Sequence, residues 1–365
     1  MLLKAENLQR TGSFKARGAL NAVLRLPPER LRAGVGAASA GNHAQALAFA
    51  AGEAGAHATV FMPAGAPVAK VAAVHGYGGE VRFVDGSYDE AGDAARRACR
   101  EEGMTLVHAF DDAHVVAGQG TAGLEIARAA PELGLALVPL GGGGLASGVA
   151  IALKEANPRT RVVGVQAENF AAYAAQGPVG ERTRGTICDG IAVKEPGEFT
   201  RPLVERWIDE VVTVTDDEVA EAMVLLLERS KQVVEGAGAV GVAAIIAGRV
   251  QAPPSGAVAV VLSGGNVDAT LLAECIRMGE TAAGRRMVLA TVVPDRPGAL
   301  AGLLEVVAEQ GANIVDVEHL REGVDLHLRE TAIHLTLQTR GPEHGRELVE
   351  AVRAHGFTVR VEREA

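Results

Sequence analysis

Short apolar runs alternate with longer stretches of helical periodicity through most of the chain. The runs are too short for helices and largely lack polar alternation, which is typical of parallel strands covered on both faces. We expect strands at Val35–Ala38, Ala58–Met62, Glu80–Val84, Thr105–Val107, Leu135–Pro139, Val162–Val165 and Val258–Leu262. We expect helices at Ala16–Leu24, Asn42–Glu53, Ala66–His75, Tyr88–Glu102, Gly118–Ala130 and Ala146–Ala156. This alternation predicts an α/β fold, in which ligands bind at the carboxyl ends of the strands.

The pattern changes from about Met287 onward. Here we expect strands at Val288–Val293, Asn313–His319, Ala332–Thr339 and Phe357–Val361, and helices at Pro297–Gln310, with proline in its first turn, and Glu343–His355. The order βαββαβ predicts a ferredoxin-like module. We therefore expect two domains, residues 1–284 and 287–365, with a linker around 280–286.

Composition narrows the function classes. The 365 residues are 48% apolar and only 3% aromatic, with 45 glycines, which is typical of an α/β enzyme. A formal net charge of −10 argues against nucleic-acid binding. No apolar run reaches the roughly 18 residues of a membrane span, and no signal peptide is expected. The three cysteines lie far apart and suggest neither a disulfide framework nor a metal site, so we expect a cytoplasmic protein without metal.

One lysine stands in an unusual position. Lys15 follows the turn-prone sequence Thr11-Gly12-Ser13 and opens a helical run. The positive end of the helix dipole disfavours a second positive charge there, which lowers a lysine pKa as a Schiff-base nucleophile requires. The alternative is an ordinary solvated lysine at a helix start.

Three strand ends carry small and polar residues. The run 39–45, Ser-Ala-Gly-Asn-His-Ala-Gln, predicts a turn whose backbone N–H groups face a carboxylate, unless Ser or Asn only caps the helix. The glycines at 141–144 and Leu145 predict a phosphate cradle rather than a flexible loop. The run 263–266, Ser-Gly-Gly-Asn, is a weak pattern alone.

Together with residues 6–18, Glu-Asn-Leu-Gln-Arg-Thr-Gly-Ser-Phe-Lys-Ala-Arg-Gly, these motifs resemble those of the threonine/serine dehydratase family of pyridoxal-phosphate enzymes. The resemblance implies a type II fold with two parallel-sheet α/β subdomains. It implies that Lys15 holds pyridoxal 5'-phosphate, Asn42 bonds its phenolic oxygen and Ser263 its ring nitrogen. The remaining assignments are the phosphate cradle (Gly141, Gly142, Gly143, Gly144 and Leu145) and the substrate carboxylate site (Ser39, Gly41, Asn42 and His43).

The resemblance also implies a reaction. Lys15 would take the Cα proton of an amino-acid substrate, with Ser39 as the second residue of the catalytic set. The Ser263 hydroxyl would not protonate the pyridine ring of the cofactor, so elimination is favoured over transamination. The expected activity is deamination of L-threonine to 2-oxobutanoate and ammonia, and of L-serine to pyruvate, in isoleucine biosynthesis or threonine catabolism.

Several alternatives stay open. Serine racemases that resemble this chain carry a serine where Ala40 stands, and alanine moves no proton, so the sequence favours elimination. A serine dehydratase, a β-replacement enzyme of the cysteine-synthase kind and a catalytically impaired amino-acid-binding regulator are the other candidates. Among the remaining motifs, we interpret Cys188 as a buried apolar residue and His43 as structural, and Asp268 is expected within a helix. We interpret Glu235 as an acid that stabilises a helix dipole at the helix start, with a substrate-pocket residue as the alternative.

The tail resembles the ACT family of amino-acid-sensing domains through Asp295-Arg-Pro-Gly-Ala-Leu300 and Gly311-Ala-Asn-Ile314. Its pairing in that family implies a homo-oligomer, a dimer or a tetramer. An amino-acid effector would contact Asp295, Pro297, Gly298, Leu300 and Asn313; a purely structural oligomerisation module is the alternative. Members of the dehydratase family usually carry 30–45 residues before the strand of the lysine motif. We therefore expect either that the start at Met1 is placed too late or that an element is missing.

Overall fold

The computed structural model describes residues 1–174, 185–321 and 326–362. The chain divides into two compact units, Met1–Asp268 and Ala269–Ala365. The division falls before helix α11 (Ala269–Ala282), earlier in the chain than the expected linker. Part of that expected linker is helical, because α11 continues to Ala282, and strand β10 begins at Arg286. Among the described residues, no helix is both long and apolar enough to cross a membrane.

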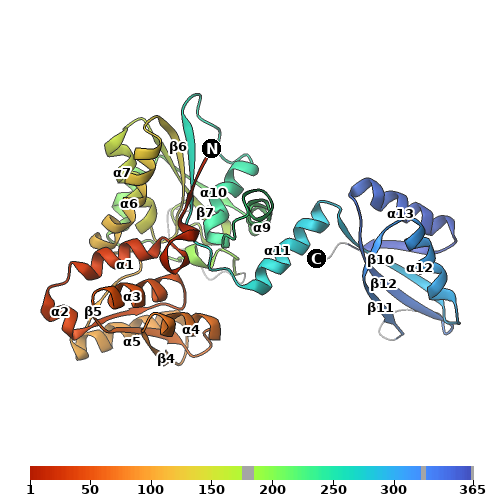
Figure 1. Cartoon of the computed structure of the whole chain (residues 1–365), viewed down its shortest axis with the longest axis horizontal. Coiled ribbons are helices and arrows are strands. Elements are labelled where there is room, and N and C mark those ends of the chain that lie inside the picture. The colour runs from red at the N-terminus through yellow and green to blue at the C-terminus, as the bar shows by residue number, and fades with distance from the viewer. Residues whose placement is uncertain (175–184, 322–325, 363–365) are drawn as a thin grey trace. The chain divides into compact units, whose positions relative to one another are not determined.

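The first unit contains two parallel sheets (Figure 1). The larger sheet has the order β1-β9-β6-β7-β8, and every pairing in it is parallel. Its strands are β1 (Leu2–Ala5), β6 (Leu133–Pro139), β7 (Arg161–Ala167), β8 (Glu210–Val214) and β9 (Ala257–Leu262). Helices that belong with this sheet are α6 (Ala113–Ala129), α7 (Gly144–Ala156), α8 (Thr200–Trp207), α9 (Asp216–Leu225) and α10 (Gly236–Ile246). Strand β8, which the apolar pattern did not reveal, has mostly half-buried positions.

The smaller sheet has the order β4-β3-β2-β5 and is also parallel. Its strands are β2 (Val35–Ala38), β3 (Ala58–Pro63), β4 (Glu80–Val84) and β5 (Thr105–Leu106). The accompanying helices are α1 (Lys15–Leu24), α2 (Pro28–Ala33), α3 (Asn42–Glu53), α4 (Val68–Gly76) and α5 (Tyr88–Glu102). The predictions of β2, α3, β4 and α5 are confirmed to the residue. The alanine and valine residues of β2 and α3 pack into one core. The expectation of two parallel-sheet subdomains is therefore confirmed.

The second unit has the predicted βαββαβ order. Its antiparallel sheet runs β11-β12-β10-β13. The elements are β10 (Arg286–Pro294), α12 (Ala299–Glu309), β11 (Asn313–Leu320), β12 (Glu330–Gln338), α13 (Pro342–Ala354) and β13 (Thr358–Glu362). The expectation that proline lies in the first turn of α12 is wrong: Pro297 precedes the helix, and Gly298 at φ +88° is its N-cap. This topology is ferredoxin-like.

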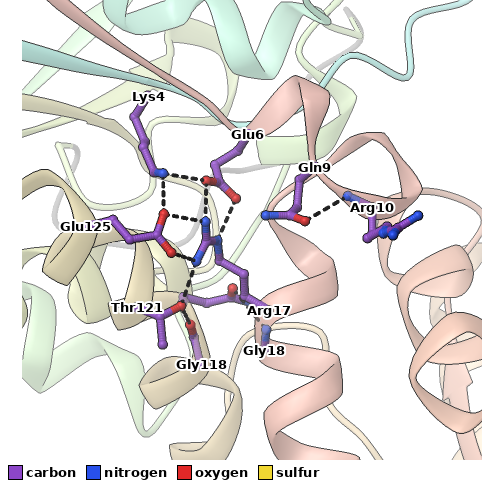
Figure 2. A network of polar contacts seen from close by, with 10 residues as sticks. Lys4, Glu6, Gln9, Arg10, Arg17, Gly18, Gly118, Thr121 and Glu125 are labelled. Atoms are coloured by element: carbon purple, nitrogen blue, oxygen red, sulfur yellow. Dashed lines mark hydrogen bonds and ion pairs between the residues drawn. The ribbon is translucent and has the colours of Figure 1, made fainter. Parts of the chain in front are cut away.

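A charge network fixes the segment that precedes Lys15 (Figure 2). Arg17 of α1 binds Glu6 through Nε at 2.7 Å and Nη2 at 2.9 Å, and it contacts both carboxylate oxygens of Glu125 on α6. Lys4 of β1 pairs with Glu125 and lies 3.5 Å from Glu6. The Glu6 side chain is only 2% exposed, so its charge depends on these cations. The network ties β1 and α6 to the helix that starts at Lys15.

Candidate active site

Strand pairing brings the predicted motifs of the larger sheet together. β9 lies between β1 and β6, and all three run parallel, so their carboxyl ends meet at one edge. The lysine segment follows β1, the glycine loop follows β6 and Ser263 follows β9. Phe14 N–H donates to the Ser263 carbonyl at 3.0 Å, which joins the first and third segments directly.

Lys15 is the first residue of α1, as predicted. Its Nζ donates to the Ala109 carbonyl at 2.7 Å and lies 5.2 Å from the centre of the Phe14 ring. Burial lowers the pKa of Lys15 to about 8, against an opposing effect of the Glu235 charge. The lowered pKa thus has desolvation as its main cause, where sequence reasoning invoked the helix dipole. The solvated-lysine alternative is wrong.

The turn after β2 lies at the start of α3. Neither Ser39 nor Asn42 caps the helix: Gly41 is the N-cap, and Asn42 is the first helical residue. Ser39 is 7% exposed, and its Oγ accepts from the Gly41 N–H at 3.2 Å. His43 Nε2 lies 2.9 Å from the Val107 carbonyl, and burial lowers the pKa of this imidazole to about 3. His43 is therefore neutral and fixes the turn, in agreement with its structural interpretation.

The glycine loop is tightly packed. A Cβ on Gly142 would lie 2.4 Å from ring atoms of Phe110, and one on Gly141 would lie 2.9 Å from the Ile191 backbone. Gly143 has φ +94° and is the N-cap of α7. Close packing of this kind requires glycine and excludes a flexible loop. The first N–H groups of α7, from Gly144 and Leu145 onward, have no acceptor within the helix and offer an anion a helix N-terminus.

A threonine distant in sequence holds the loop from outside. Thr200 at the start of α8 donates its hydroxyl to the Gly142 carbonyl at 2.6 Å, and Tyr173 contacts the same carbonyl at 3.5 Å. Asp111 Oδ1 in turn accepts from the Thr200 N–H at 3.0 Å. Because the peptide unit is planar and trans, a fixed Gly142 carbonyl turns the Gly143 N–H to the opposite side. Neither Thr200 nor Phe110 carried a local sequence signal.

Ser263 closes the site. It is 2% exposed, and its hydroxyl donates to the Ala237 carbonyl at 3.3 Å. Asp268 lies just before α11, so the expectation that it is helical is wrong, because the helix starts one residue later. Cys188 is fully buried, and burial raises the pKa of its thiol to about 12, which supports its interpretation as an apolar residue.

Glu235 differs from its interpretation as a helix-start acid. It is the N-cap residue of α10, but its side chain makes no capping bond. Instead Oε1 accepts from Asn42 Nδ2 at 2.8 Å, and the residue is only 5% exposed. Asn266, in the weak third motif, donates Nδ2 to Asn42 Oδ1 at 2.7 Å.

These residues fit pyridoxal phosphate. The chemistry of the donors matches the group: an amine with a near-neutral pKa, a glycine loop at a helix N-terminus and two buried hydroxyls. The buried hydroxyls of Ser13 and Ser147, next to Lys15 and to the glycine loop in sequence, have no partner in the structure. Across residues 1–174, 185–321 and 326–362, no three acidic, histidine or cysteine side chains are grouped to hold a metal.

In the second unit, the expected effector loop is exposed. Asp295 pairs with Arg321 at 3.0 Å, and a Cβ on Gly298 would meet no atom within 4 Å. Asn313 Nδ2 lies 3.4 Å from Gln338 Oε1, whereas Leu300 is partly buried in the unit's core.

The chain is similar to proteins of known family. The chain is 45% identical over 363 residues to an L-threonine ammonia-lyase of Thermotoga maritima, covering 98% of this chain and 90% of that protein. Its fold matches the processed form of threonine deaminase isoform 2 from Solanum lycopersicum (TM-score 0.70, 32% identity, 75% and 77% coverage) and maize serine racemase (TM-score 0.69, 34% identity, 74% and 84% coverage). The model of the pyridoxal-phosphate dependent enzymes matches residues 1–264. The chain therefore belongs to the pyridoxal-phosphate dependent enzyme family.

Proposed function

We propose that this enzyme deaminates L-threonine to 2-oxobutanoate and ammonia, and L-serine to pyruvate. The observation that carries the proposal is the half-buried Lys15 amine, whose pKa burial lowers to about 8, in a segment that is hydrogen-bonded to Ser263. The names of the similar proteins, L-threonine ammonia-lyase and threonine deaminase, support the substrate. Pyridoxal phosphate, when bound, supplies the electron withdrawal that acidifies Cα.

Side chains of the protein accept the proton, bind the substrate and contact the cofactor ring in this proposal. The Lys15 amine accepts the Cα proton, and the turn 39–43 binds the substrate carboxylate at the start of α3. Ser263 gives the ring nitrogen a neutral hydrogen-bond partner, which favours prompt loss of the β-hydroxyl. Ala40 has only a methyl group, so no second base stands next to Ser39 to return a proton from the other face. This favours elimination over the racemase activity of the maize relative.

Formation of 2-oxo acid from L-threonine and L-serine tests this proposal, with D-isomer formation measured in the same samples. We expect 2-oxo acid to exceed D-isomer by at least about tenfold. Equal rates of the two products would contradict the elimination mechanism. Absence of both, with cofactor bound, would point to a catalytically impaired regulator.

We further propose that the second unit is an ACT domain that senses an amino acid in a homo-oligomer. The ferredoxin-like topology and the exposed loop around Asp295, Pro297 and Gly298 support this assignment. Leu300 and Asn313 complete the proposed contacts. Titration of the full-length enzyme with isoleucine and valine should change its rate, and Asp295→Ala should weaken that response. An unchanged rate with every amino acid tested would contradict the sensing role.

A further inference from the structure

The carboxamide of Asn42 is held at both ends. Asn266 Nδ2 donates to the Thr11 carbonyl at 2.8 Å and to Asn42 Oδ1 at 2.7 Å. Because a backbone carbonyl only accepts, the amide orientation of Asn266 is fixed, and that of Asn42 follows from it. Asn42 therefore presents Nδ2 to Glu235, 2.8 Å away, and retains one N–H for another acceptor.

Glu235 has no structural task that accounts for its burial. Its side chain caps no helix, and among the described residues no cation forms an ion pair with it within 4 Å. The charged groups that face it are Asp189, Lys70 and Lys15, all at longer range. A buried carboxyl that receives only an amide hydrogen bond costs stability. The packing is nevertheless built around it, since a Cβ on Gly264 would lie 2.1 Å from Glu235 Oε1.

We propose that Glu235 is a positioning residue of the cofactor site, which fixes the Asn42 carboxamide and acts on Lys15 through its charge. The proposal rests on the proposed function, in which Asn42 and Lys15 contact the cofactor. The electrostatics agree with this proposal. Burial lowers the pKa of Lys15, and the charge of Glu235 opposes that change; burial raises the pKa of Glu235, and the charge of Lys15 opposes that change.

The pH range follows from the two groups. Burial, with a further effect of Asp189, raises the pKa of Glu235 to about 7, while Lys70 and Lys15 act against this rise. Glu235 is therefore mostly ionised where Lys15 titrates, near pH 8. Removing its charge lowers the pKa of Lys15, so the neutral Lys15 amine that cofactor uptake would require forms at lower pH.

Two variants of the full-length protein separate the two roles. Glu235→Gln keeps an acceptor for Asn42 but loses the charge, whereas Glu235→Ala loses both; Glu53→Gln, exposed at the other end of α3, is the control. For each protein, freed of cofactor, the rate of pyridoxal phosphate uptake is measured against pH, and the Kd is measured at pH 8.

We expect the uptake midpoint of Glu235→Gln to fall by about one pH unit, with a Kd within about threefold of the parent. Glu235→Ala should weaken binding by about tenfold or more. An unchanged midpoint in Glu235→Gln would overturn the electrostatic role, and an unchanged Kd in Glu235→Ala would overturn the positioning role. Failure of the parent protein to take up the cofactor would instead refute the proposed function.

Discussion

Thr200→Val tests whether the glycine loop is oriented from outside. Valine has nearly the shape of threonine, so the substitution removes the hydroxyl and keeps the packing. That hydroxyl donates to the Gly142 carbonyl at 2.6 Å and also lies 3.2 Å from Asp111 Oδ1. Thr200 and Gly142 are both buried, and the Tyr173 hydroxyl at 3.5 Å is too distant to replace the bond to Gly142 fully. A buried carbonyl left without its partner costs about 1–3 kcal/mol.

The free-energy cost of the unpartnered Gly142 carbonyl lowers the stability of the fold and also weakens cofactor binding. Loss of the bond lowers the free energy of unfolding of the cofactor-free protein, measured in urea, by about 1–2 kcal/mol. The Gly142–Gly143 peptide then rotates more freely, and reordering it on binding costs about 1.4 kcal/mol, which corresponds to a tenfold higher Kd for pyridoxal phosphate. Thr200→Ser keeps the hydroxyl, so its Kd should stay within about threefold of the parent value. The reasoning is refuted if Thr200→Val loses stability but binds pyridoxal phosphate as tightly as the parent.

Three further substitutions test the site and its support. Lys15→Ala should abolish the visible absorbance of the lysine-bound cofactor, and retention of that absorbance would exclude Lys15 as its attachment point. Gly142→Ala places a Cβ 2.4 Å from the Phe110 ring and should cost about 1–3 kcal/mol of unfolding free energy and weaken cofactor binding; an unchanged Kd would count against the cradle. Arg17→Met leaves the buried Glu6 carboxylate with Lys4, 3.5 Å away, in place of its two bonds to Arg17 (Figure 2), and should lower the free energy of unfolding by about 3 kcal/mol. Arg10→Met, at an exposed position, should change it by less than about 0.5 kcal/mol; equal effects would contradict the network.

Much of the architecture followed from local pattern. Continuous apolar strands and alanine-rich helices predicted a parallel α/β fold, because a strand buried on both faces has little freedom in composition. The division into two parallel-sheet subdomains came from the resemblance to the dehydratase family. In the tail, the order of strands and helices predicted the ferredoxin-like module. The less periodic region containing β8 and α9 gave a weaker signal, because its strand is only half buried. The motifs at the ends of β2, β6 and β9 also indicated which segments form the site.

Other features depended on contacts between distant segments. The sequence by itself determined that a lysine opens a helix near a glycine loop, but only the packing around Lys15 decided that desolvation lowers its pKa. Glu235 and Asn42 are 193 residues apart, and Thr200 and Gly142 are 58 apart, so their bonds leave no periodic trace. A hydrogen bond of this kind depends on where two elements meet in space. Sheet pairing and core packing determine that position. Local sequence thus determined the elements and most of the residues of the candidate site, whereas tertiary structure determined the contacts that orient and tune them.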